Sequence, residues 1–285
     1  MSKPNSLTIT STIEALRKQI QALKASSKTI ALVPTMGALH QGHLSLIEFA
    51  KQKSDIAVCS IFVNPTQFGQ NEDLDSYPRP LQDDIDALER TGAHIAFTPD
   101  VKEIYPEGFQ TSVSVNQLSL GLCGGNRPGH FDGVATIVAK LLLMVLPDIA
   151  IFGEKDYQQL MVIRQMVKDL AMPIKIEGAP IVRDFDGLAL SSRNAYLSEP
   201  ERAKAPLIHD TLKECHAALV TGKDIKDVLL KGTRRLEGAG FDIEYFELRH
   251  AQTLAPLNHL PKAGNGRLLV AAKLGTTRLI DNLAV

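Results

Sequence analysis

The residues best suited to chemistry in this sequence are two histidines, His40 and His43, within the stretch PTMGALHQGH at residues 34–43. Gly37 and Gly42 lie beside them, and the apolar run TIALV comes directly before the stretch. Glycine permits a tight turn and lets a ligand approach the start of a helix, where free backbone N–H groups favour phosphate. Imidazoles at such a place can donate hydrogen bonds to phosphate oxygens or protonate a leaving group.

Two other interpretations of the histidine pair stay open from these residues alone. A metal site needs a third ligand at a useful spacing, which is missing, and His-x-x-His by itself is not a zinc signature. A capped turn with two structural histidines is the other alternative. Phosphate binding is favoured over both, and the polar segments elsewhere in the chain test it.

Two more polar clusters follow apolar runs. Asn64 and Gln67 in NPTQFG are uncharged groups that can hydrogen-bond a hydroxyl, an amide or a carboxylate, although Asn-Pro alone is also typical of a turn. Lys155, in the sequence GEKD at residues 153–156, would be a cation near phosphates. Its acidic neighbours also fit a solvated surface cluster, which is the stronger interpretation of that segment taken alone.

A fourth cluster, LALSSRN, contains Ser191, Ser192 and Arg193. Two hydroxyl donors and a guanidinium, which binds oxygens through two parallel N–H groups, suit a polyphosphate, but a polar turn before a helix is an equal alternative. The glycine-rich stretch GLCGGNRPGHFDGV carries Arg127 and His130. It could be a mobile loop that closes to exclude water, or a plain connection.

The elements that must position these clusters alternate between apolar strands and amphipathic helices. We expect strands at residues 29–33, 55–63, 94–97, 148–152 and 174–182, and helices at residues 12–25, 42–53, 80–90, 133–146 and 156–170. This alternation predicts a parallel sheet covered on both faces, an α/β Rossmann-like domain. Ligands bind at the carboxyl ends of the strands in such sheets, so we expect the four polar clusters on one rim.

The pattern changes after about residue 184. Helices are expected at residues 198–220, with Ser198 as the cap, and at residues 223–237. The stretches FDIEYFEL, RLLVAAKLG and TRLIDNLAV then alternate like antiparallel strands. We therefore expect two domains: a Rossmann-like N-terminal domain at residues 1–183 and a smaller α+β C-terminal domain at residues 184–285.

Composition excludes several classes of protein. The net charge of −1 and the pI near 6.7 give no basic excess, so we expect no nucleic-acid partner. The sequence contains neither GxxxxGK[ST] nor a GxGxxG after the first strand, which argues against a Walker-type NTPase and a Rossmann dehydrogenase. The N-terminal residues 1–12 lack the apolar core of a signal peptide, and the longest apolar run is interrupted by Pro147 and Asp148. With three widely spaced cysteines, we expect a cytoplasmic protein without a membrane partner.

The motifs together carry a family resemblance. PTMGALHQGH resembles the His-x-Gly-His signature of the adenylyl-transferring nucleotidyltransferases, and LALSSRN is similar to their second signature, with Ser-Ser-Arg in place of the usual lysine. Six strings in the same order, from about residue 30 to the C-terminus, resemble the pantoate–β-alanine ligase family: VPTMGALHQGH, SIFVNPTQFG, RPGHFDGVATIV, FGEKDYQQL, LSSRNAYLS and AAKLGTTRLIDN.

The resemblance implies an ATP-dependent amide synthesis that uses Mg²⁺, with pantoate and β-alanine as substrates and a homodimer as the usual assembly. It implies catalytic roles for His40, Lys155 and Arg193, and for His43 as the proton donor. Pantoate would be held by Gln67 and Gln159, with Asn64 as a neighbour, and Gln67 would also contact β-alanine. ATP would be bound by Met36, Gly37, Ala38, Leu39, His40, Gln41, Gly42, His43, Gly153, Glu154, Lys155, Asp156, Val182, Leu190, Ser191, Ser192 and Arg193.

Two other functions compete with the ligase. One is another nucleotidyltransferase, such as a cytidylyltransferase or a tRNA-charging relative, although the balanced charge argues against tRNA. The other is a catalytically silent ATP-binding sensor, which the intact motifs disfavour. The ligands of Mg²⁺ stay unassigned: Asp83 and Asp84 are acidic and near the expected rim, without a placement on the metal.

Overall fold

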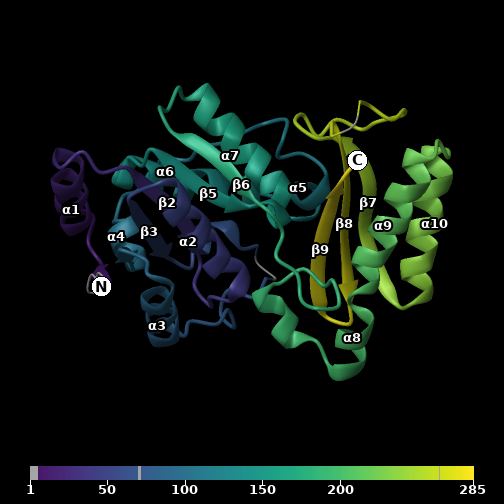
Figure 1. Cartoon of the computed structure of the whole chain (residues 1–285), viewed down its shortest axis with the longest axis horizontal. Helices are drawn as coiled ribbons and strands as arrows, with labels where there is room; N and C mark the ends of the chain where they lie inside the picture. Colours follow the sequence, from purple (N-terminus) through teal and green to yellow (C-terminus); the bar gives the residue numbers. More distant parts are fainter. Residues whose placement is uncertain (1–5, 70–71, 263) are drawn as a thin grey trace. The chain divides into compact units, whose positions relative to one another are not determined.

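The structure is a computed structural model that describes residues 6–69, 72–262 and 264–285 (Figure 1). Contacts divide the chain into two compact units. The first unit comprises the residues up to Asn116, Arg127–Glu154 and Val162–Pro180, and the second comprises Gln117–Asn126, Lys155–Met161 and Ile181–Val285.

The first unit is built on a six-stranded sheet whose pairs are all parallel. Its strands are β1 (Thr8–Thr10), β2 (Ile30–Thr35), β3 (Ile56–Ile61), β4 (Ile95–Phe97), β5 (Ile149–Gly153) and β6 (Lys175–Ala179). The spatial order is β1-β4-β3-β2-β5-β6, so the order reverses between β2 and β5. That reversal is the place where doubly wound sheets bind ligands, and it confirms the expected α/β Rossmann-like architecture.

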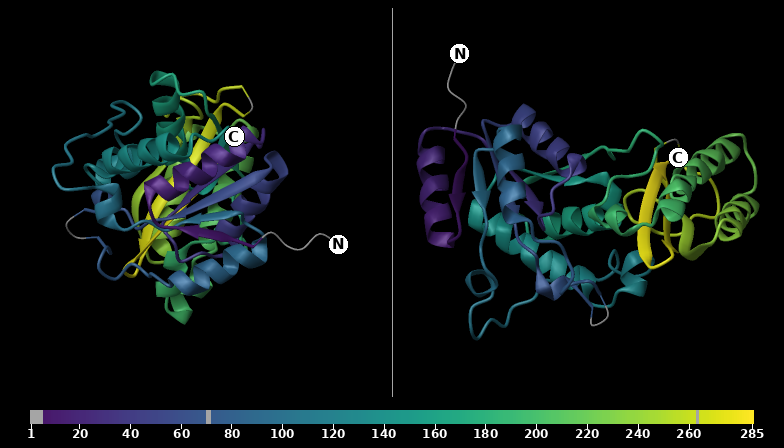
Figure 2. Two further views of the ribbon diagram at one scale, coloured as in Figure 1. Left: turned by 90° about the vertical axis from the view of Figure 1, so that its left-hand side faces the viewer. Right: turned by 90° about the horizontal axis from the view of Figure 1, so that it is seen from below.

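Helices cover both faces of this sheet (Figures 1 and 2). One face carries α2 (Gln41–Lys53), which packs on β2, β3 and β5 and contacts α3 (Leu81–Thr91). Helix α6 (His130–Val145) also packs on β2, and it contacts α1 (Ile13–Ala25). Because both faces are covered, the central strands β2 and β3 are buried along nearly their whole length and do not alternate between buried and exposed residues.

Two helices before residue 130 are short, namely α4 (Val101–Ile104) and, in the second unit, α5 (Leu122–Asn126). The longer helix α7 (Tyr157–Asp169) begins in the second unit and ends in the first. Neither β1 nor α4 was expected from the sequence, because three or four residues are too few to display a period.

The second unit contains the three-stranded antiparallel sheet β7 (Phe241–His250), β8 (Gly266–Leu274) and β9 (Thr277–Ala284), as expected. The single helix expected at residues 198–220 is wrong. It is two helices, α8 (Glu199–Lys204) and α9 (Leu207–Val220), because Pro206 has no N–H to continue the first one. With α10 (Ile225–Gly238), α9 packs on this sheet around a core that includes Leu212, Leu236 and Val270.

Across the described part of the chain, none of the helices has the length and apolar character needed to cross a membrane. Residues 1–5, part of the N-terminal segment judged above to lack a signal-peptide core, lie outside the described residues.

Candidate functional site

The turn after β2 is sharp because two consecutive residues have left-handed backbones. Gly37 has a φ of 79° and Ala38 a φ of 50°. The hydroxyl of Thr35 accepts from the Gly37 N–H at 3.3 Å and donates to the Ser60 carbonyl of β3 at 2.7 Å. The turn is thereby tied to the neighbouring strand, and the chain is directed into α2.

A buried carboxylate holds the next part of this turn. Asp84 of α3, only 2% exposed, accepts from the backbone N–H of Ala38 at 2.9 Å and of Leu39 at 2.7 Å. Burial raises the pKa of Asp84, while the two N–H bonds act to lower it. A side chain at Gly37 would begin 2.8 Å from the Asp84 carboxylate, so this position requires glycine for space as well as for backbone conformation.

His40 and His43 cap the start of α2 with their own rings. The Nδ1 atom of His40 accepts from the Gly42 N–H at 3.1 Å, and the Nδ1 of His43 accepts from the His40 N–H at 3.4 Å. A backbone N–H can only donate, so the neutral form of each ring carries its proton on Nε2. The two rings stack with centroids 4.1 Å apart, and both present an Nε2–H donor beside the N-terminus of a helix.

The segment after β3 lies against this turn. It forms a 3₁₀ turn, η1 (Pro65–Gln67), capped by the Asn64 side chain. Asn64 is 1% exposed and Gln67 is 8% exposed. The Gln67 Nε2 atom lies 3.0 Å from the Sδ of Met36, which brings the first two predicted clusters together.

Arg127 and His130, expected only as lid residues, anchor Gln67 in the first unit. The carbonyl of Gln67 is 2.8 Å from Nδ1 of His130, and the Arg127 guanidinium donates to the same carbonyl at 3.4 Å. Both guanidinium edges are used, since Arg127 also forms a two-bond ion pair with Glu72. Burial acts to raise the pKa of Glu72, but hydrogen bonds and charge from Arg127 outweigh it and the pKa is lowered.

The third cluster begins where β5 ends. Since β2, β3 and β5 are parallel members of one sheet, the segments that follow them leave from the same edge. Gly153 ends β5, and a Cβ built there would meet no atom within 4 Å. Its φ is not left-handed, so neither packing nor backbone conformation requires glycine at this position.

Lys155 belongs to the second unit, where the sequence around it is held by β9 and β8. The Lys155 carbonyl accepts from the Asn282 side chain at 2.9 Å, and Asn282 in turn accepts from Arg267 at 2.7 Å. The Arg267 guanidinium stacks 4.1 Å from the Tyr157 ring centre. The Lys155 ammonium itself lies 3.6 Å from the Asp156 carboxylate and is partly exposed.

Val182 and Leu190 face each other across a hairpin. The Leu190 N–H donates to the Val182 carbonyl at 3.0 Å, next to the bridge between Arg183 and Ala189. Arg183 fixes this hairpin to β9 through two bonds to the buried Asp281, at 2.6 and 2.9 Å. Two residues expected to contact ATP are therefore held at the ends of one rigid segment.

Ser191, Ser192 and Arg193 follow the hairpin directly. Ser191 caps a 3₁₀ turn, η3 (Ser192–Tyr196), by accepting from the Arg193 N–H at 3.3 Å. All three side chains are partly exposed. The polar-turn interpretation is correct as local structure.

The two adjacent glutamines of α7 have different surroundings. The amide of Gln158 is buried and bonds three backbone groups of residues 118–123: it accepts from the Cys123 N–H at 2.9 Å and donates to the carbonyls of Leu118 and Gly121. Gln159, the residue predicted for pantoate, is half-buried. The structure thus separates a structural glutamine from one that can meet a ligand.

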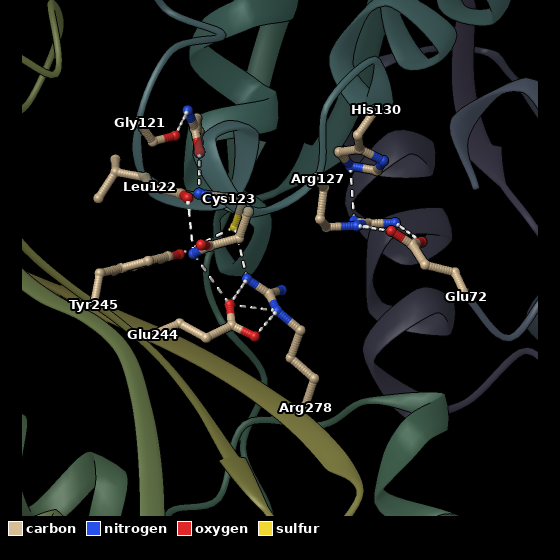
Figure 3. A network of polar contacts seen from close by, with 11 residues as sticks. Glu72, Gly121, Leu122, Cys123, Arg127, His130, Glu244, Tyr245 and Arg278 are labelled. Carbon is tan, nitrogen blue, oxygen red and sulfur yellow. Dashed lines mark hydrogen bonds and ion pairs between the residues drawn. The ribbon is translucent and has the colours of Figure 1, made fainter. Parts of the chain in front are cut away.

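Residues 117–126 are held further by a second polar network (Figure 3). The Cys123 Sγ lies 3.0 Å from the Tyr245 hydroxyl and 3.4 Å from the Arg278 guanidinium, which also forms an ion pair with Glu244 at 2.8 Å. Burial raises the pKa of Tyr245, so its hydroxyl stays protonated. This network clamps the segment onto β7 and β9.

The predicted residues divide between the two units. The first unit contains Met36, Gly37, Ala38, Leu39, His40, Gln41, Gly42, His43, Asn64, Gln67, Gly153 and Glu154, and the second contains Lys155, Asp156, Gln159, Val182, Leu190, Ser191, Ser192 and Arg193. Sequence reasoning missed Tyr105, Arg267 and Asn282, and it placed Asp84 near the expected rim without predicting its bonds to the turn after β2. Asp84 had the only detectable signal, a second acid in the first turn of a helix close to the expected rim.

The strand order and the polar segments after β2, β3 and β5 define an α/β protein of the class that binds its ligand at the carboxyl ends of parallel strands. The model of the family described as pantoate-beta-alanine ligase matches residues 8–284. The chain belongs to the pantoate–β-alanine ligase family.

Relatives of known name agree with this assignment. The pantothenate synthetase of Rhodospirillum rubrum is 52% identical over 280 residues, which cover 98% of this chain and 99% of the relative. That of Chromohalobacter salexigens is 53% identical over 277 residues, 96% of this chain and 97% of the relative.

Solved structures give the same result. The crystal structure of pantothenate synthetase from Thermus thermophilus superimposes with a TM-score of 0.92 at 44% identity, over 97% of this chain and 99% of that one. The pantoate-beta-alanine ligase of Francisella tularensis, solved with beta-gamma ATP and beta-alanine, gives 0.82 at 35% identity, over 98% of both chains.

Proposed function

We propose that this protein condenses pantoate with β-alanine at the expense of ATP, giving pantothenate, AMP and pyrophosphate. The observation that carries the proposal is the family match over residues 8–284, which includes every segment that supplies a predicted site residue. The solved relative from Francisella tularensis, bound to an ATP analogue and β-alanine, supports both of these as substrates here.

The reaction has two steps in this proposal. A carboxylate oxygen of pantoate attacks the α-phosphorus of ATP, the bond to the β-phosphate oxygen breaks, and pyrophosphate leaves with both electrons of that bond. The amine of β-alanine then attacks the acyl carbon of pantoyl adenylate and loses a proton, and AMP departs. Negative charge gathers on the phosphate oxygens in the first step, so fixed donors and cations should dominate catalysis.

The donors proposed for that step are imidazoles, cationic side chains and hydroxyls. The Nε2–H groups of His40 and His43 are set by their capping bonds and would donate to phosphate oxygens, with His43 as the proton donor to the leaving group. Lys155 and Arg193 would supply cations, and Ser191 and Ser192 hydroxyl donors. A ligand lying against Gly153 would explain why that position is glycine, since no protein atom does.

Pantoate would be bound by Gln67 and Gln159, and Gln67 would also contact β-alanine. Asn64 has its amide engaged within the protein, so its contribution to the pantoate pocket would be to hold Gln67. Water must be kept from the acyl adenylate, because hydrolysis would waste it. Arg127 and His130 would serve this end by fixing the loop that carries Gln67.

Mg²⁺ would arrive with ATP in this proposal. The described residues contain no group of three His, Cys, Asp or Glu side chains able to enclose a metal ion. Magnesium in nucleotide sites is commonly held by phosphate oxygens, waters and only one or two carboxylates, so the donor set is compatible with it. When bound, the ion would neutralise charge on the phosphates. The proposal also includes a homodimer, which rests on the family resemblance, and a cytoplasmic location, which rests on the three widely spaced cysteines and the N-terminal residues.

The test is the exchange of labelled pyrophosphate into ATP. Exchange that requires pantoate, and AMP formation that also requires β-alanine, would support the proposal; exchange without pantoate would contradict it. In His43→Asn, the Asn oxygen can still accept the His40 N–H while the Nε2 donor is lost. We expect exchange to fall by about 10²- to 10⁴-fold, the usual worth of a positioned acid, with the fold intact by circular dichroism. His216→Asn on α9 is the matched control.

A further inference from the structure

The side-chain amide of Asn64 is oriented by groups that allow only one assignment of its oxygen and nitrogen. Its Nδ2 lies 3.2 Å from the carbonyl of Gly133 at the start of α6, and a carbonyl can only accept. At the other end, Oδ1 lies 3.4 Å from the backbone N–H of Thr66, which can only donate. The nitrogen must therefore face α6 and the oxygen must face η1.

Two hydroxyls complete the bonds to the Asn64 oxygen. Tyr105, which ends α4, donates from its hydroxyl at 2.8 Å, and the Thr66 hydroxyl donates at 3.0 Å. The Tyr105 ring is fixed by an edge contact with Phe109, at 5.0 Å between centroids, and by Phe62 at 6.2 Å. Burial raises the pKa of Tyr105, so its hydroxyl stays protonated near neutral pH.

Gly133 makes this close approach possible. A Cβ there would lie 2.3 Å from the Thr66 carbonyl, so only glycine lets the first turn of α6 come against η1. Because α6 and η1 are in contact, the Gly133 carbonyl is held where Asn64 needs an acceptor. The backbone groups thus decide which end of the Asn64 amide is the oxygen, and the Tyr105 hydroxyl adds a bond that holds this amide in place. An amide flip would set donor against donor and acceptor against acceptor.

The fixed side-chain amide of Asn64 determines the orientation of the Gln67 side-chain amide. Its second Nδ2 hydrogen is donated to the Oε1 of Gln67 at 3.1 Å, so the Nε2 of Gln67 must point the other way. The atom that Nε2 meets is the thioether sulfur of Met36, a weak acceptor, at 3.0 Å. A ligand oxygen would be a much better partner for these N–H groups than a thioether. The backbone of Gln67 is immobilised as well, by His130 and Arg127.

We propose that Tyr105 is a positioning residue, which through Asn64 fixes the Gln67 amide so that it offers only N–H donors to the acid substrate. The site would then select an oxygen acceptor, a carboxylate or hydroxyl oxygen of pantoate, and disfavour a donor in its place. This inference rests on the proposed function, which places pantoate at Gln67. Tyr105 itself touches no substrate in this scheme.

The first experiment measures pantoate-dependent pyrophosphate exchange with Tyr105→Phe, which removes one hydroxyl and keeps the ring packing. We expect the KM for pantoate to rise roughly 2- to 10-fold, as the loss of one neutral hydrogen bond implies, with the KM for ATP unchanged. Tyr245→Phe is the matched control, because it removes a buried hydroxyl from the second unit and should leave the pantoate KM as it is.

The second experiment separates positioning from a general structural effect. If Tyr105 acts through Gln67, then adding Tyr105→Phe to a Gln67→Ala variant should change the pantoate KM no further, whereas independent effects would multiply. Gln67→Glu keeps an oxygen for Asn64 and presents a second oxygen to the substrate, so we expect a larger rise in pantoate KM than for Gln67→Ala.

The outcomes distinguish the two proposals. Absence of pantoate-dependent exchange in the wild-type protein would overturn the proposed function and this inference with it. Normal exchange in the wild type with an unchanged pantoate KM in Tyr105→Phe, or with multiplicative effects of Tyr105→Phe and Gln67→Ala, would overturn the inference alone.

Discussion

At the scale of single residues, the side chains proposed to act in catalysis are oriented by backbone N–H and carbonyl groups. His40 and His43 receive a backbone N–H on Nδ1, which assigns the donor role to Nε2. A ring nitrogen or amide that faces a backbone group has only one compatible orientation, because the backbone cannot exchange donor for acceptor. The polarity of the site is therefore set by the fold before any ligand arrives.

Asp84 illustrates this at the turn after β2 and gives a testable prediction. Asp84→Ala leaves the N–H groups of Ala38 and Leu39 without their acceptor in a partly buried turn. We expect the free energy of unfolding to fall by about 1–3 kcal/mol, which is the usual cost of donors left without an acceptor. We also expect the KM for ATP to rise, because the turn that leads to His40 would no longer be held in one conformation.

The neighbouring Asp83 provides the control, since it carries the same charge in the same turn of α3 but is exposed. Asp83→Ala should stay within about 0.5 kcal/mol of the wild type in urea unfolding. Equal losses in the two variants would show that net charge, and not the bonds to the turn, accounts for the effect.

At the scale of elements, His94 joins three strands at the edge of the sheet. The ring atom Nδ1 of His94 accepts from the Ala57 N–H of β3 at 3.0 Å. The backbone N–H of His94 donates to the Ala57 carbonyl, and the backbone carbonyl of His94 accepts from the Thr8 N–H of β1. Burial, with the charge of Lys51, lowers the pKa of His94 from its ordinary 6.5. The bond to β3 needs an unprotonated Nδ1, so it forms only while the His94 ring is neutral.

The sign of the resulting pH dependence follows from linkage. A lowered pKa means that the unfolded chain binds a proton more readily, so the stability is present above pH 6.5 and is lost as the pH falls through the lowered pKa. We expect the wild-type Tm to drop between pH 7.5 and 5.5. In His94→Asn, whose side-chain oxygen can accept the Ala57 N–H without titrating, the drop should be smaller. It should not vanish, since His209 in the second unit also has a lowered pKa from burial and from Arg183. An identical pH profile in the variant would contradict this role of His94.

Two glycines of α10 provide a matched pair for packing. A Cβ at Gly232 would lie 2.1 Å from the Phe246 ring of β7 and 2.8 Å from the Cys215 sulfur, whereas a Cβ at Gly238 would meet no atom within 4 Å. Gly232→Ala should destabilise the protein by about 1–3 kcal/mol through overpacking, and Gly238→Ala should be neutral or stabilising by up to about 1 kcal/mol. Thermal unfolding of both variants decides, and a neutral Gly232→Ala would show that the helix can shift outward at little cost.

Long elements were predictable from the sequence, and short or interrupted ones were not. The period of α1 and the apolar runs of β2 and β3 predicted each within two residues at either end. The three residues of β1 carry no period, and the apolar spacing of residues 198–220 continues through a break that Pro206 imposes. The first three polar clusters could be recognised because each follows a strand, whereas residues 191–193 follow the hairpin between Val182 and Leu190. Asp84 and Tyr105 act from segments whose relation to the site exists only after folding.

At the scale of the whole molecule, the second unit is not continuous in sequence. Residues 117–126 and 155–161 belong to it, although the sequence around them belongs to the first. The bonds responsible join residues far apart: the Cys123 N–H and Gln158 are separated by 35 positions, and Asn282 and the Lys155 carbonyl by 127. The sequence pattern indicates a change of architecture near residue 184. Contacts between residues so far apart in the sequence leave no periodic signal.

This arrangement predicts that a chain starting at residue 181 makes an incomplete second unit. Such a fragment lacks Tyr157, which stacks on the buried Arg267, and the Lys155 carbonyl, which accepts from the Asn282 side chain. It also lacks Cys123, so the Tyr245 hydroxyl loses its contact. One cation–π contact and two hydrogen bonds are together worth about 2 kcal/mol or more, and the amides of β8 and β9 should exchange correspondingly faster than in the full chain.

A fragment starting at residue 155 restores Tyr157 and the Lys155 carbonyl, and it should recover part of the protection in hydrogen exchange. If the amides of the two fragments exchange at the same rate, residues 155–161 contribute nothing to the stability of the second unit. The contacts of Arg267 and Asn282 with this segment would then be consequences of the fold and would not stabilise it.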